Sequence, residues 1–506
     1  MRASNNVTIN ADAEDFEFEN LRTLSNATTI NALNSYLNDF RSISYLGRFI
    51  YDYAGKYLVT ASIRRDGVSR FGPGNRWGTF PSFSLGWKLN EDLLPNVDEI
   101  DMLKLRFGWG QVGNSNIGNY RYSSFLGQYN DFAPVFGVGQ IHGRALNRLN
   151  STGNPLIKWE ASATTNFGVD LNMYGNKFTL SAEYYIKQVD DLLVKTLTSQ
   201  AWGVNIDPRS GGQPWDNLGS LENRGFEFTS SYRKMEGVFN YEVNATFTTI
   251  KNEVIDIPEA ITDRPNNITR IGNTVGSLYG YVAERILTPE DYDEDGNLLY
   301  AAPVGVNPQP GDLLFKDLNQ DGAITPEDRT IIGKAIPDFT YSLNVNLYYK
   351  AFDMGIFFYG NQNFELLNQN YATIATIDDQ DNDHNKLLAY AQNYYREDRP
   401  STEFVRADPL DVNENNRTSS WWVEDASFLR LKDIQLGFTI PESTSQRVGI
   451  SRARVFLNTT NLFTFTKYKG RDPEAPMNSS LPLSPGIDNN SYPLPRTFGG
   501  GVQLTF

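Results

Sequence analysis

Apolar and polar residues alternate along many segments of this chain. The clearest example is 178–187 (FTLSAEYYIK), in which every second residue is apolar and those between are mainly hydroxylic or charged. Because successive side chains of a β-strand point to opposite faces, such a segment has one apolar face and one polar face. The same alternation recurs in 83–87, 103–109, 167–173, 239–247, 343–349 and 434–440. Counting all such segments predicts about fourteen strands.

The predicted connections between these strands are of two lengths. Tight turns that suit β-hairpins are predicted at Ala54-Gly55, Gly175-Asn176 and Glu236-Gly237. Long polar loop insertions are predicted near 190–222, 251–337, 361–426 and 464–495. Short turns on one rim and long loops on the other are typical of outer-membrane β-barrels.

Aromatic residues near the predicted strand ends are consistent with a barrel but do not distinguish it from a soluble β protein. Trp77, Trp87 and Trp109, among others, would form interfacial girdles in a barrel but would equally fill the core of a soluble β protein. The polar strand faces favour the barrel, because amides, carboxylates and Arg64 or Arg106 suit a hydrated lumen better than a second packed sheet. We therefore predict an all-β fold, a transmembrane antiparallel β-barrel with long extracellular loops.

Composition narrows the possible functions. The 506 residues contain no run of the roughly 18 apolar residues that a spanning helix needs. Cys is absent and only His142 and His384 supply imidazole, which argues against thiolate sites, Ser–His hydrolysis and His-based zinc chemistry. We expect no enzyme activity. The formal charge of -15 argues against nucleic acid as a partner, because such binders neutralise phosphates. The first residues, MRASNNVTIN, show no secretory signal.

The last residues, GGVQLTF, form another alternating segment. Val502, Leu504 and Phe506 fall on its apolar face, and the final position is aromatic. A terminal Phe on an alternating strand is the pattern of outer-membrane assembly. We therefore expect this segment to be the closing strand of the barrel and Phe506 to be its assembly signal.

Several longer segments carry a family pattern in a fixed order. They are YAGKYLVTASIRRDGVSRFG, LKLRFGWGQVGN, NLGSLENRGFEF, GDLLFKDLNQDGAITPEDRTIIGKAIPDFTYSLNV, WWVEDASFLRLKDIQLGFTIP and YPLPRTFGGGVQLTF. Together they resemble TonB-dependent outer-membrane transporters of the SusC/RagA type. The resemblance runs from about residue 40 to residue 506.

This resemblance implies a barrel of 22 strands in the outer membrane of a Gram-negative bacterium. It also implies an N-terminal plug, energy supplied through the TonB complex, and a SusD-like surface lipoprotein that closes over the transporter as a lid. The implied substrate is an oligosaccharide or else a peptide. Two other functions stay open, a non-transporting extracellular β-sheet protein that binds glycans and a passive porin.

The sequence departs from the family pattern at its N-terminal side. We find no plug domain and no TonB-contacting segment, and about fourteen of the expected strands. We therefore expect a C-terminal portion of the transporter, with residues 1–40 as a partial loop or strand leading into the barrel. Residues 41–506 would form the C-terminal part of the barrel itself, and any contact with TonB would lie in the missing N-terminal region.

One loop carries its own chemistry, because its spacing fits positions 1, 3, 5, 6, 7, 9 and 12 of a calcium-binding EF-hand loop. The residues are Asp317, Asn319, Asp321, Gly322, Ala323, Thr325 and Asp328. Asp328 replaces the usual Glu, and its shorter reach should weaken the site. We predict Ca²⁺ in this loop, with a metal-free turn as the alternative. A second acidic loop, from Asp291 to Ala302, lacks an acid at position 12 and is interpreted as a solvated turn.

The remaining polar and aromatic candidates are weaker. The acid pairs Asp190-Asp191 and Asp378-Asp379 have no nearby nucleophile or base, so we interpret them as solvated loop charges. Loop aromatic residues could contact a sugar or a peptide, although packing of the loops is the preferred explanation. They are Trp202, Trp215, Tyr390, Tyr394 and Tyr395. No substrate-binding residue is assigned.

Overall fold

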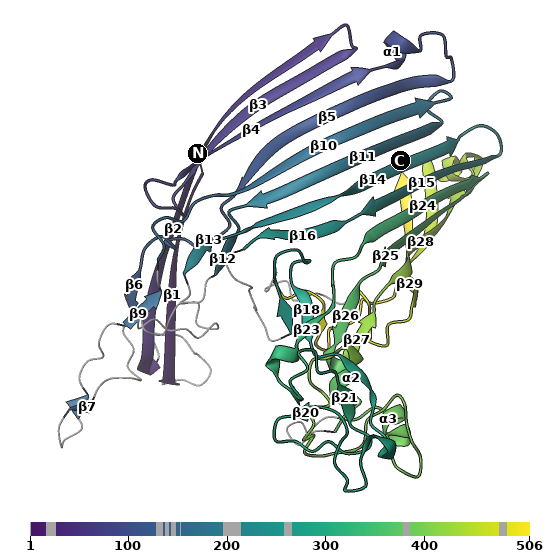
Figure 1. The fold of residues 1–506 in the computed structure, drawn as a ribbon. Helices are drawn as coiled ribbons and strands as arrows, with labels where there is room; N and C mark the ends of the chain where they lie inside the picture. The colour runs from purple at the N-terminus through teal and green to yellow at the C-terminus, as the bar shows by residue number, and fades with distance from the viewer. Residues whose placement is uncertain are drawn as a thin grey trace. The chain divides into compact units, whose positions relative to one another are not determined.

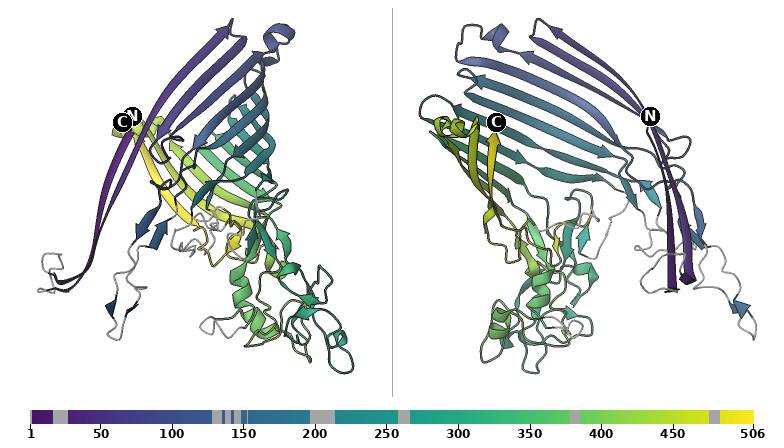
Figure 2. Two further views of the ribbon diagram at one scale, coloured as in Figure 1. Left: turned by 60° about the vertical axis from the view of Figure 1, so that its left-hand side comes forward. Right: turned by 180° about the vertical axis from the view of Figure 1, so that it is seen from behind.

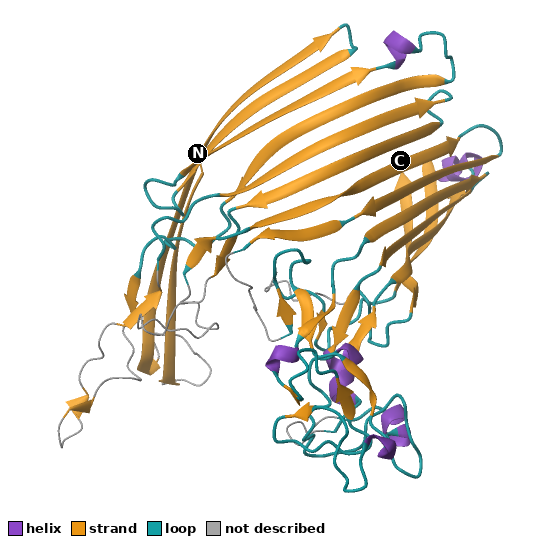
Figure 3. Ribbon diagram, viewed as in Figure 1, coloured by secondary structure: helices purple, strands orange, loops and turns teal. Residues whose placement is uncertain are grey.

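The structure is a computed structural model, shown as a ribbon in Figure 1. It describes residues 2–16, 27–127, 135–136, 141–142, 148–151, 153–195, 214–257, 266–377, 385–474 and 483–506. Strands dominate these residues, whereas helices are few and short (Figure 3). No helix in this part of the chain is long and apolar enough to cross a membrane.

One principal sheet contains fifteen of the described strands. Its hydrogen-bonded order is β1-β2-β3-β4-β5-β10-β11-β14-β15-β24-β25-β28-β29-β31, and β16 pairs with β14 beside this path. The strands are β1 (Arg2–Phe16), β2 (Ala27–Tyr53), β3 (Tyr57–Val68), β4 (Trp77–Lys88), β5 (Ile100–Asn114), β10 (Glu160–Met173), β11 (Phe178–Asp190), β14 (Ser220–Lys234), β15 (Phe239–Thr249), β16 (Lys251–Asp256), β24 (Phe339–Tyr349), β25 (Phe352–Gln362), β28 (Phe428–Ile440), β29 (Arg452–Thr466) and β31 (Thr497–Thr505). Neighbours with a defined register pair antiparallel, from β1 with β2 to β29 with β31. The predicted antiparallel all-β fold is confirmed.

Tight turns join several neighbouring strands of this sheet. The register of β2 and β3 closes at Tyr53 and Tyr57, which confirms the predicted turn at Ala54-Gly55. The φ angles of the two turn residues are 53° and 69°. Positive φ at both positions is the backbone of a type I′ hairpin turn, and glycine adopts it without steric cost.

The chain divides into two compact units, of which the first comprises residues 1–86, 107–165 and 187–220. Its buried apolar cluster consists of Val68, Phe71, Ile117 and Ile157. Its short strand pairs are β6 (Phe125–Gly127) with β9 (Arg148–Ser151), β7 (Val135–Phe136) with β8 (Ile141–His142), and β12 (Leu193–Lys195) with β13 (Trp215–Asn217). The second unit comprises residues 87–106, 166–186 and 221–506, and it includes the short helices α1 (Asn90–Leu93) and α4 (Glu442–Ser445).

A loop-rich body of the second unit is called the lobe below. It comprises the described residues between β16 and β24, between β25 and β28, and between β29 and β31. Its elements are β17 (Asn267–Ile268), β18 (Ser277–Gly280), β19 (Ala283–Ile286), β20 (Ala302–Pro303), β21 (Leu313–Phe315), β22 (Ala323–Ile324), β23 (Thr330–Gly333), β26 (Glu365–Asn368), α2 (Gln369–Ile374), α3 (Leu388–Asn393), β27 (Val423–Asp425) and β30 (Ile487–Asp488). These small elements share one buried core that includes Leu278, Phe315, Tyr390 and Trp422. The long connections therefore fold together, as the views in Figure 2 also show.

Candidate functional site

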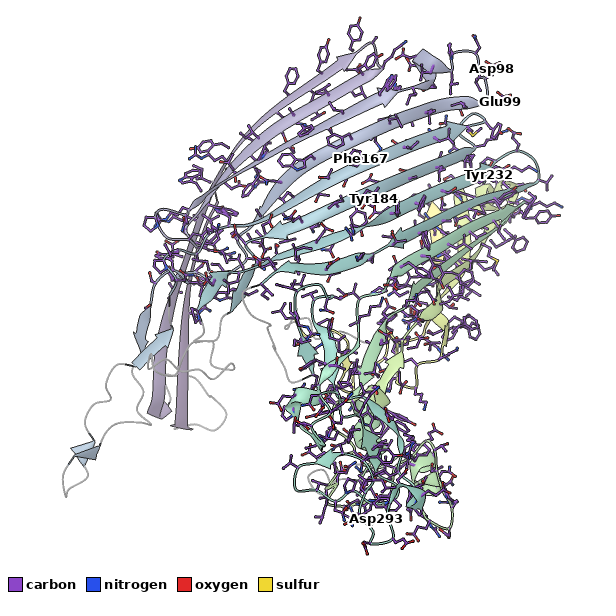
Figure 4. All side chains as sticks on the ribbon, viewed as in Figure 1. Asp98, Glu99, Phe167, Tyr184, Tyr232 and Asp293 are labelled. Carbon is purple, nitrogen blue, oxygen red and sulfur yellow. The ribbon has the colours of Figure 1, made fainter. Side chains whose placement is uncertain are left out.

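One face of the strands in the second unit carries two rows of aromatic side chains. The row near the lobe consists of Tyr184, Phe226, Phe228, Phe247 and Phe339, whose successive ring centroids lie 4.9–6.4 Å apart. The row near the tight turns includes Tyr232, Phe239 and Tyr241, and Figure 4 labels Tyr184 and Tyr232 as members of the two rows. Between Phe239 and Phe247 the strand extends about 27 Å, at about 3.4 Å per residue. This spacing suits two aromatic girdles that flank an apolar band about 25 Å tall.

The opposite face of the same strands is polar. One continuous row of register partners crosses six strands from β15 to β31 and consists of Glu242, Asn346, Gly355, Gln435, Asn458 and Gly499. Next to it, the hydroxyls of Thr246 and Ser342 hydrogen bond at 2.7 Å. Amides and hydroxyls both donate and accept hydrogen bonds. The row therefore presents three amides, one carboxylate (Glu242) and two glycines, so it is polar without being uncharged.

Two arginines on this polar face pair with carboxylates across glycines. Arg454 of β29 donates from Nε to Oδ1 of Asp353 on β25 (2.9 Å) and from Nη2 to Gln435 (2.9 Å). Gly437 of β28 is the register partner of Asp353. A Cβ atom at Gly437 would lie within 3.0 Å of both Arg454 and Asp353. The missing side chain therefore leaves the space through which this ion pair crosses β28.

A second ion pair uses the same arrangement on β5, β10 and β11. Arg106 donates to Asp170 and to Glu183, both at 3.0 Å. A Cβ atom at Gly168 of β10 would lie 2.9 Å from Nη2 of Arg106. We call these two arrangements the arginine braces. Each one neutralises a positive charge on the polar face and links three adjacent strands.

A third ion cluster joins the principal sheet to the segment that follows β29. Arg430 is 1% exposed, and its guanidinium contacts Asp472, Glu474 (2.7 Å) and the hydroxyl of Thr464 (2.9 Å). A buried arginine is tolerated only when its charge and its donors are satisfied. Asp472 and Glu474 are therefore fixed against β28 by Arg430.

The lobe is stabilised by a buried polar network as well as by its apolar core. Asp312 accepts hydrogen bonds from Nε of Arg406 (2.7 Å) and Nδ2 of Asn415 (3.0 Å). Asp411 accepts from the backbone and side chain of the same Asn415 at 2.8 and 2.9 Å. Burial raises the pKa of Asp411 to about 6, because the hydrogen bonds only partly offset the loss of solvent and Asp312 adds repulsion.

A cation–π stack lies beside this network. The guanidinium of Arg417 lies over the rings of Tyr281 (5.0 Å) and Phe315 (4.9 Å). Its Nη2 also donates to the carbonyl of Asn413 at 3.0 Å. Stacking against ring faces suits the planar guanidinium better than the ammonium group of lysine. Arg417 therefore links Tyr281, which precedes β19, and Phe315 of β21 to the segment that contains Asn413.

The structure separates the predicted calcium residues into two groups. In the first, Asp317 accepts from the backbone N–H of Gln320 (2.6 Å) and Gly322 (2.8 Å), and Nδ2 of Asn319 donates to Asp321 (2.9 Å). These three side chains form the turned part of the loop. Ala323 lies beyond them in β22.

The second group closes the other end of the same loop. Asp328 is fully buried and accepts from the backbone N–H groups of Leu318 and Thr325, both at 2.8 Å. Burial raises its pKa, but these backbone donors outweigh that effect and hold the pKa below its usual value. Thr325 caps the 3-10 helix Pro326–Asp328. Among the described residues, no group of three or more Asp, Glu, His or Cys is arranged to hold a metal ion. Calcium binding by this loop stays a prediction.

The second acidic loop differs from the expected solvated turn at its first residue. Asp291 is 5% exposed, and both of its oxygens accept from Arg285 at 2.6 Å. Asp293 accepts from backbone N–H groups of an exposed turn and is labelled in Figure 4. Asp291 and Asp328 both end a Thr-Pro-Glu-Asp segment that forms a 3-10 helix with a capping box. The repeated Thr-Pro-Glu-Asp motif was the signal in the sequence that its Asp closes a capping box and stabilises the loop.

The loop aromatic residues are mainly structural where they are described. Tyr390 is 1% exposed and Tyr395 3% exposed in the lobe core, and Tyr394 packs against the same core. Trp215 belongs to β13 and packs against the buried cluster of the first unit. Trp202 lies outside the described residues.

The remaining sequence candidates are also accounted for. Asp191 pairs with Lys158 at 2.7 Å, and Asp190 accepts from Gln188 at 2.9 Å. Asp378, Asp379 and His384 lie outside the described residues, and His142 lies in β8. Phe506 follows β31 and is 85% exposed, and its role as an assembly signal stays a prediction.

Comparisons with known proteins identify the family. A family model described as TonB dependent receptor-like, beta-barrel matches residues 4–462. The chain belongs to this family. TonB-dependent receptor P3 of Formosa agariphila is 31% identical over 502 residues, which cover 96% of this chain and 47% of that protein. TonB-dependent receptor SusC of Bacteroides thetaiotaomicron is 30% identical over 479 residues, which cover 92% of this chain and 44% of that protein.

A solved structure shares the fold of this TonB-dependent receptor barrel. The structure of the RagAB peptide transporter superposes with a TM-score of 0.80 at 22% identity, over 100% of this chain and 52% of that chain. The chain spans about half the length of the curated relatives it matches. The relatives are receptors and not enzymes, and barrels of this family are outer-membrane proteins of Gram-negative bacteria. The predicted family, the absence of enzyme activity and the outer-membrane localisation are thereby confirmed.

Sequence reasoning missed the arginine braces. Their partners lie 64 to 101 positions apart in the sequence, so no local pattern brings them together. The available signal was a glycine at a polar-face position within an alternating strand, as at Gly168 and Gly437. Glycine in a strand interior often marks the close approach of another group.

Proposed function

We propose that this chain forms part of the barrel wall of an active importer that takes up a nutrient through the outer membrane with energy from the TonB complex. The observation that carries the proposal is the combination of an apolar face with two aromatic rows and a polar face with paired charges. A wall of this kind suits lipid on one side and a hydrated substrate path on the other. Membership of the TonB-dependent receptor family supports the active mechanism.

The substrate class and the surface partner belong to the same proposal. SusC and RagAB are among the similar proteins, and RagAB is named a peptide transporter. We infer a substrate of oligosaccharide or peptide size and a SusD-like lipoprotein as the lid. The lobe, with its own core, is the part of this chain that we expect to contact that partner.

A growth experiment with the complete gene tests the importer function. The gene is deleted in its own bacterium, and growth is compared on a defined oligosaccharide or peptide as the limiting nutrient. We expect deletion to slow growth, the complete gene to restore it, and restoration to fail when TonB is also deleted. Restored growth without TonB would instead indicate a passive porin.

A fractionation experiment tests the membrane component of the proposal. Outer membranes are separated from soluble and secreted fractions, and the protein is examined on gels before and after heating. We expect the protein in detergent-extractable outer membrane, with a migration that changes on heating. Recovery as a water-soluble extracellular protein would favour the glycan-binding alternative.

A further inference from the structure

A pocket of about 760 Å³ lies in the second unit, beside the start of β16 and along β23. Its lining comes from the segments 250–253, 272–277 and 331–338 and from Glu365. We call it the junction pocket, because these segments lie where the principal sheet continues into the lobe. Its volume falls within the roughly 300–1,000 Å³ that is typical of small-molecule sites.

Four of the five charged groups that line the junction pocket form two ion pairs, each with one exposed and one half-buried partner. Lys251 pairs with Glu253 at 3.1 Å, and Lys334 pairs with Asp338. The side chains of Lys251 and Asp338 are 60% and 46% exposed. Exposed ion pairs contribute little stability, so a ligand can replace one partner at small cost. The pocket therefore offers both positive and negative groups to a ligand that carries both charges.

The apolar part of the lining is aliphatic. It consists of the isoleucines Ile250, Ile331, Ile332 and Ile336. Among the described residues that line the pocket, none is aromatic. The negative face of an aromatic ring attracts the polarised C–H groups of a sugar ring, and this lining offers no such face. Aliphatic side chains instead suit the side chains of a peptide.

The main chain of β23 adds a third feature. Among the described strands, β23 is an outer strand of the sheet β17–β18–β23 and pairs with β18 only. The consecutive residues 331–333 all line the pocket. Because their side chains alternate in direction, the pocket borders the edge of the strand as well as a face. An unpaired strand edge binds an extended peptide by adding it as a further strand.

We propose that the junction pocket binds a short extended peptide that carries both charges, paired through its main chain with β23 and through its charged groups with the lysines and acids of the rim. This site deepens the proposed import function and rests on it, because it selects peptide from the two substrate classes. Lys251 and Lys334 bind carboxylates of the peptide, and Asp338 and Glu253 bind its ammonium groups.

A retention experiment with the complete receptor in detergent tests the site. The probes are a tryptic digest of casein and a mixture of malto-oligosaccharides, and the retained compounds are measured by mass spectrometry. We expect peptides to be retained and malto-oligosaccharides not to be. The double variant Lys251→Glu/Lys334→Glu should retain at least about tenfold less peptide. Lys177→Glu, which alters a Lys–Glu pair of 2.9 Å outside the pocket, is the matched control and should retain peptide as the wild type does.

The outcomes separate this site from the import function. Equal retention by the double variant and the wild type would overturn the site, and so would retention of no peptide at all. Retention of malto-oligosaccharides that the lysine variant abolishes would overturn the peptide class. If the double variant fails to fold, Lys334→Gln removes the charge, shortens the side chain by one atom and carries the same test. Growth that depends on TonB would still support the importer in each of these cases.

Discussion

Replacing Gly437 with alanine should break one arginine brace without removing any charged group. The added Cβ would lie within 3.0 Å of Nη2 of Arg454 and of both carboxylate oxygens of Asp353, so these side-chain ends must shift and we expect the ion pair to lose its present geometry. The two side chains are 14% and 23% exposed, which places the pair between the surface and buried cases. Losing such a charge-assisted pair costs about 1–3 kcal/mol.

Part of that loss is offset in the backbone. Alanine is more favourable than glycine inside a strand by roughly 0.5–1 kcal/mol. The expected net destabilisation by Gly437→Ala is therefore about 1 kcal/mol, within a range of about 0–2.5 kcal/mol, or roughly a fivefold lower ratio of folded to unfolded protein. Urea unfolding in detergent micelles, followed by tryptophan fluorescence, measures this difference as a lower midpoint at unchanged slope.

Two further variants decide whether the brace is the cause. Gly108 lies in β5, and a Cβ there would meet no atom within 4 Å, so Gly108→Ala should be neutral or slightly stabilising. In a background that already carries Arg454→Ala, the cost of Gly437→Ala should nearly vanish, because the two changes remove the same interaction. An equal cost in both backgrounds would refute the brace, and so would a cost that Gly108→Ala reproduces.

Three other predictions concern the lobe. Arg417→Lys should loosen the lobe and increase its cleavage by trypsin at least severalfold, because an ammonium lacks the planar face that the guanidinium lays against Tyr281 and Phe315; unchanged cleavage would contradict the stack. Burial raises the pKa of Asp411 from 3.8 to about 6, so its ionisation opposes folding above about pH 6 and the lobe should become more stable as the pH falls towards about 4. Asp411→Asn should flatten that dependence in urea titrations at pH 5 and pH 8, and equal pH dependence would count against it. Calcium measured by mass spectrometry after dialysis should fall in Asp317→Ala and Asp321→Ala, and unchanged calcium in both would remove the calcium prediction.

The strands could be predicted because the residues that determine each strand and each tight turn are close together in the sequence. An alternating segment such as 178–187 specifies its own two faces, and a tight turn such as Ala54-Gly55 needs only two residues. The lobe was harder, since its strands are two to four residues long and their partners lie far apart in the chain. Phe315 of β21 takes Ala283 of β19 as its register partner, and Trp422 joins the same core from a third segment.

The candidate sites were less predictable for the same physical reason. Asp328 satisfied an EF-hand spacing, yet its carboxylate is occupied by backbone N–H groups of the cap that Thr325 begins. The spacing of residues in the sequence does not show which hydrogen-bond donors reach a given carboxylate oxygen in the folded protein. Tyr390 looked available for a ligand, but its ring is buried because α3 packs into the lobe core.

The distribution of charge connects the braces to the proposed import path. The whole chain carries a formal charge of -15, yet the arginines that face the polar side of the sheet at 106 and 454 each pair with carboxylates of neighbouring strands. These two arginines therefore leave no unbalanced positive charge on a polar face that also carries amides and hydroxyls. Such a wall would let a hydrated substrate of either sign move past without being held, because amides and hydroxyls exchange hydrogen bonds with water at little cost. Selection among substrates must then arise elsewhere, and the exposed mixed charges of the junction pocket are the feature of this chain suited to that task.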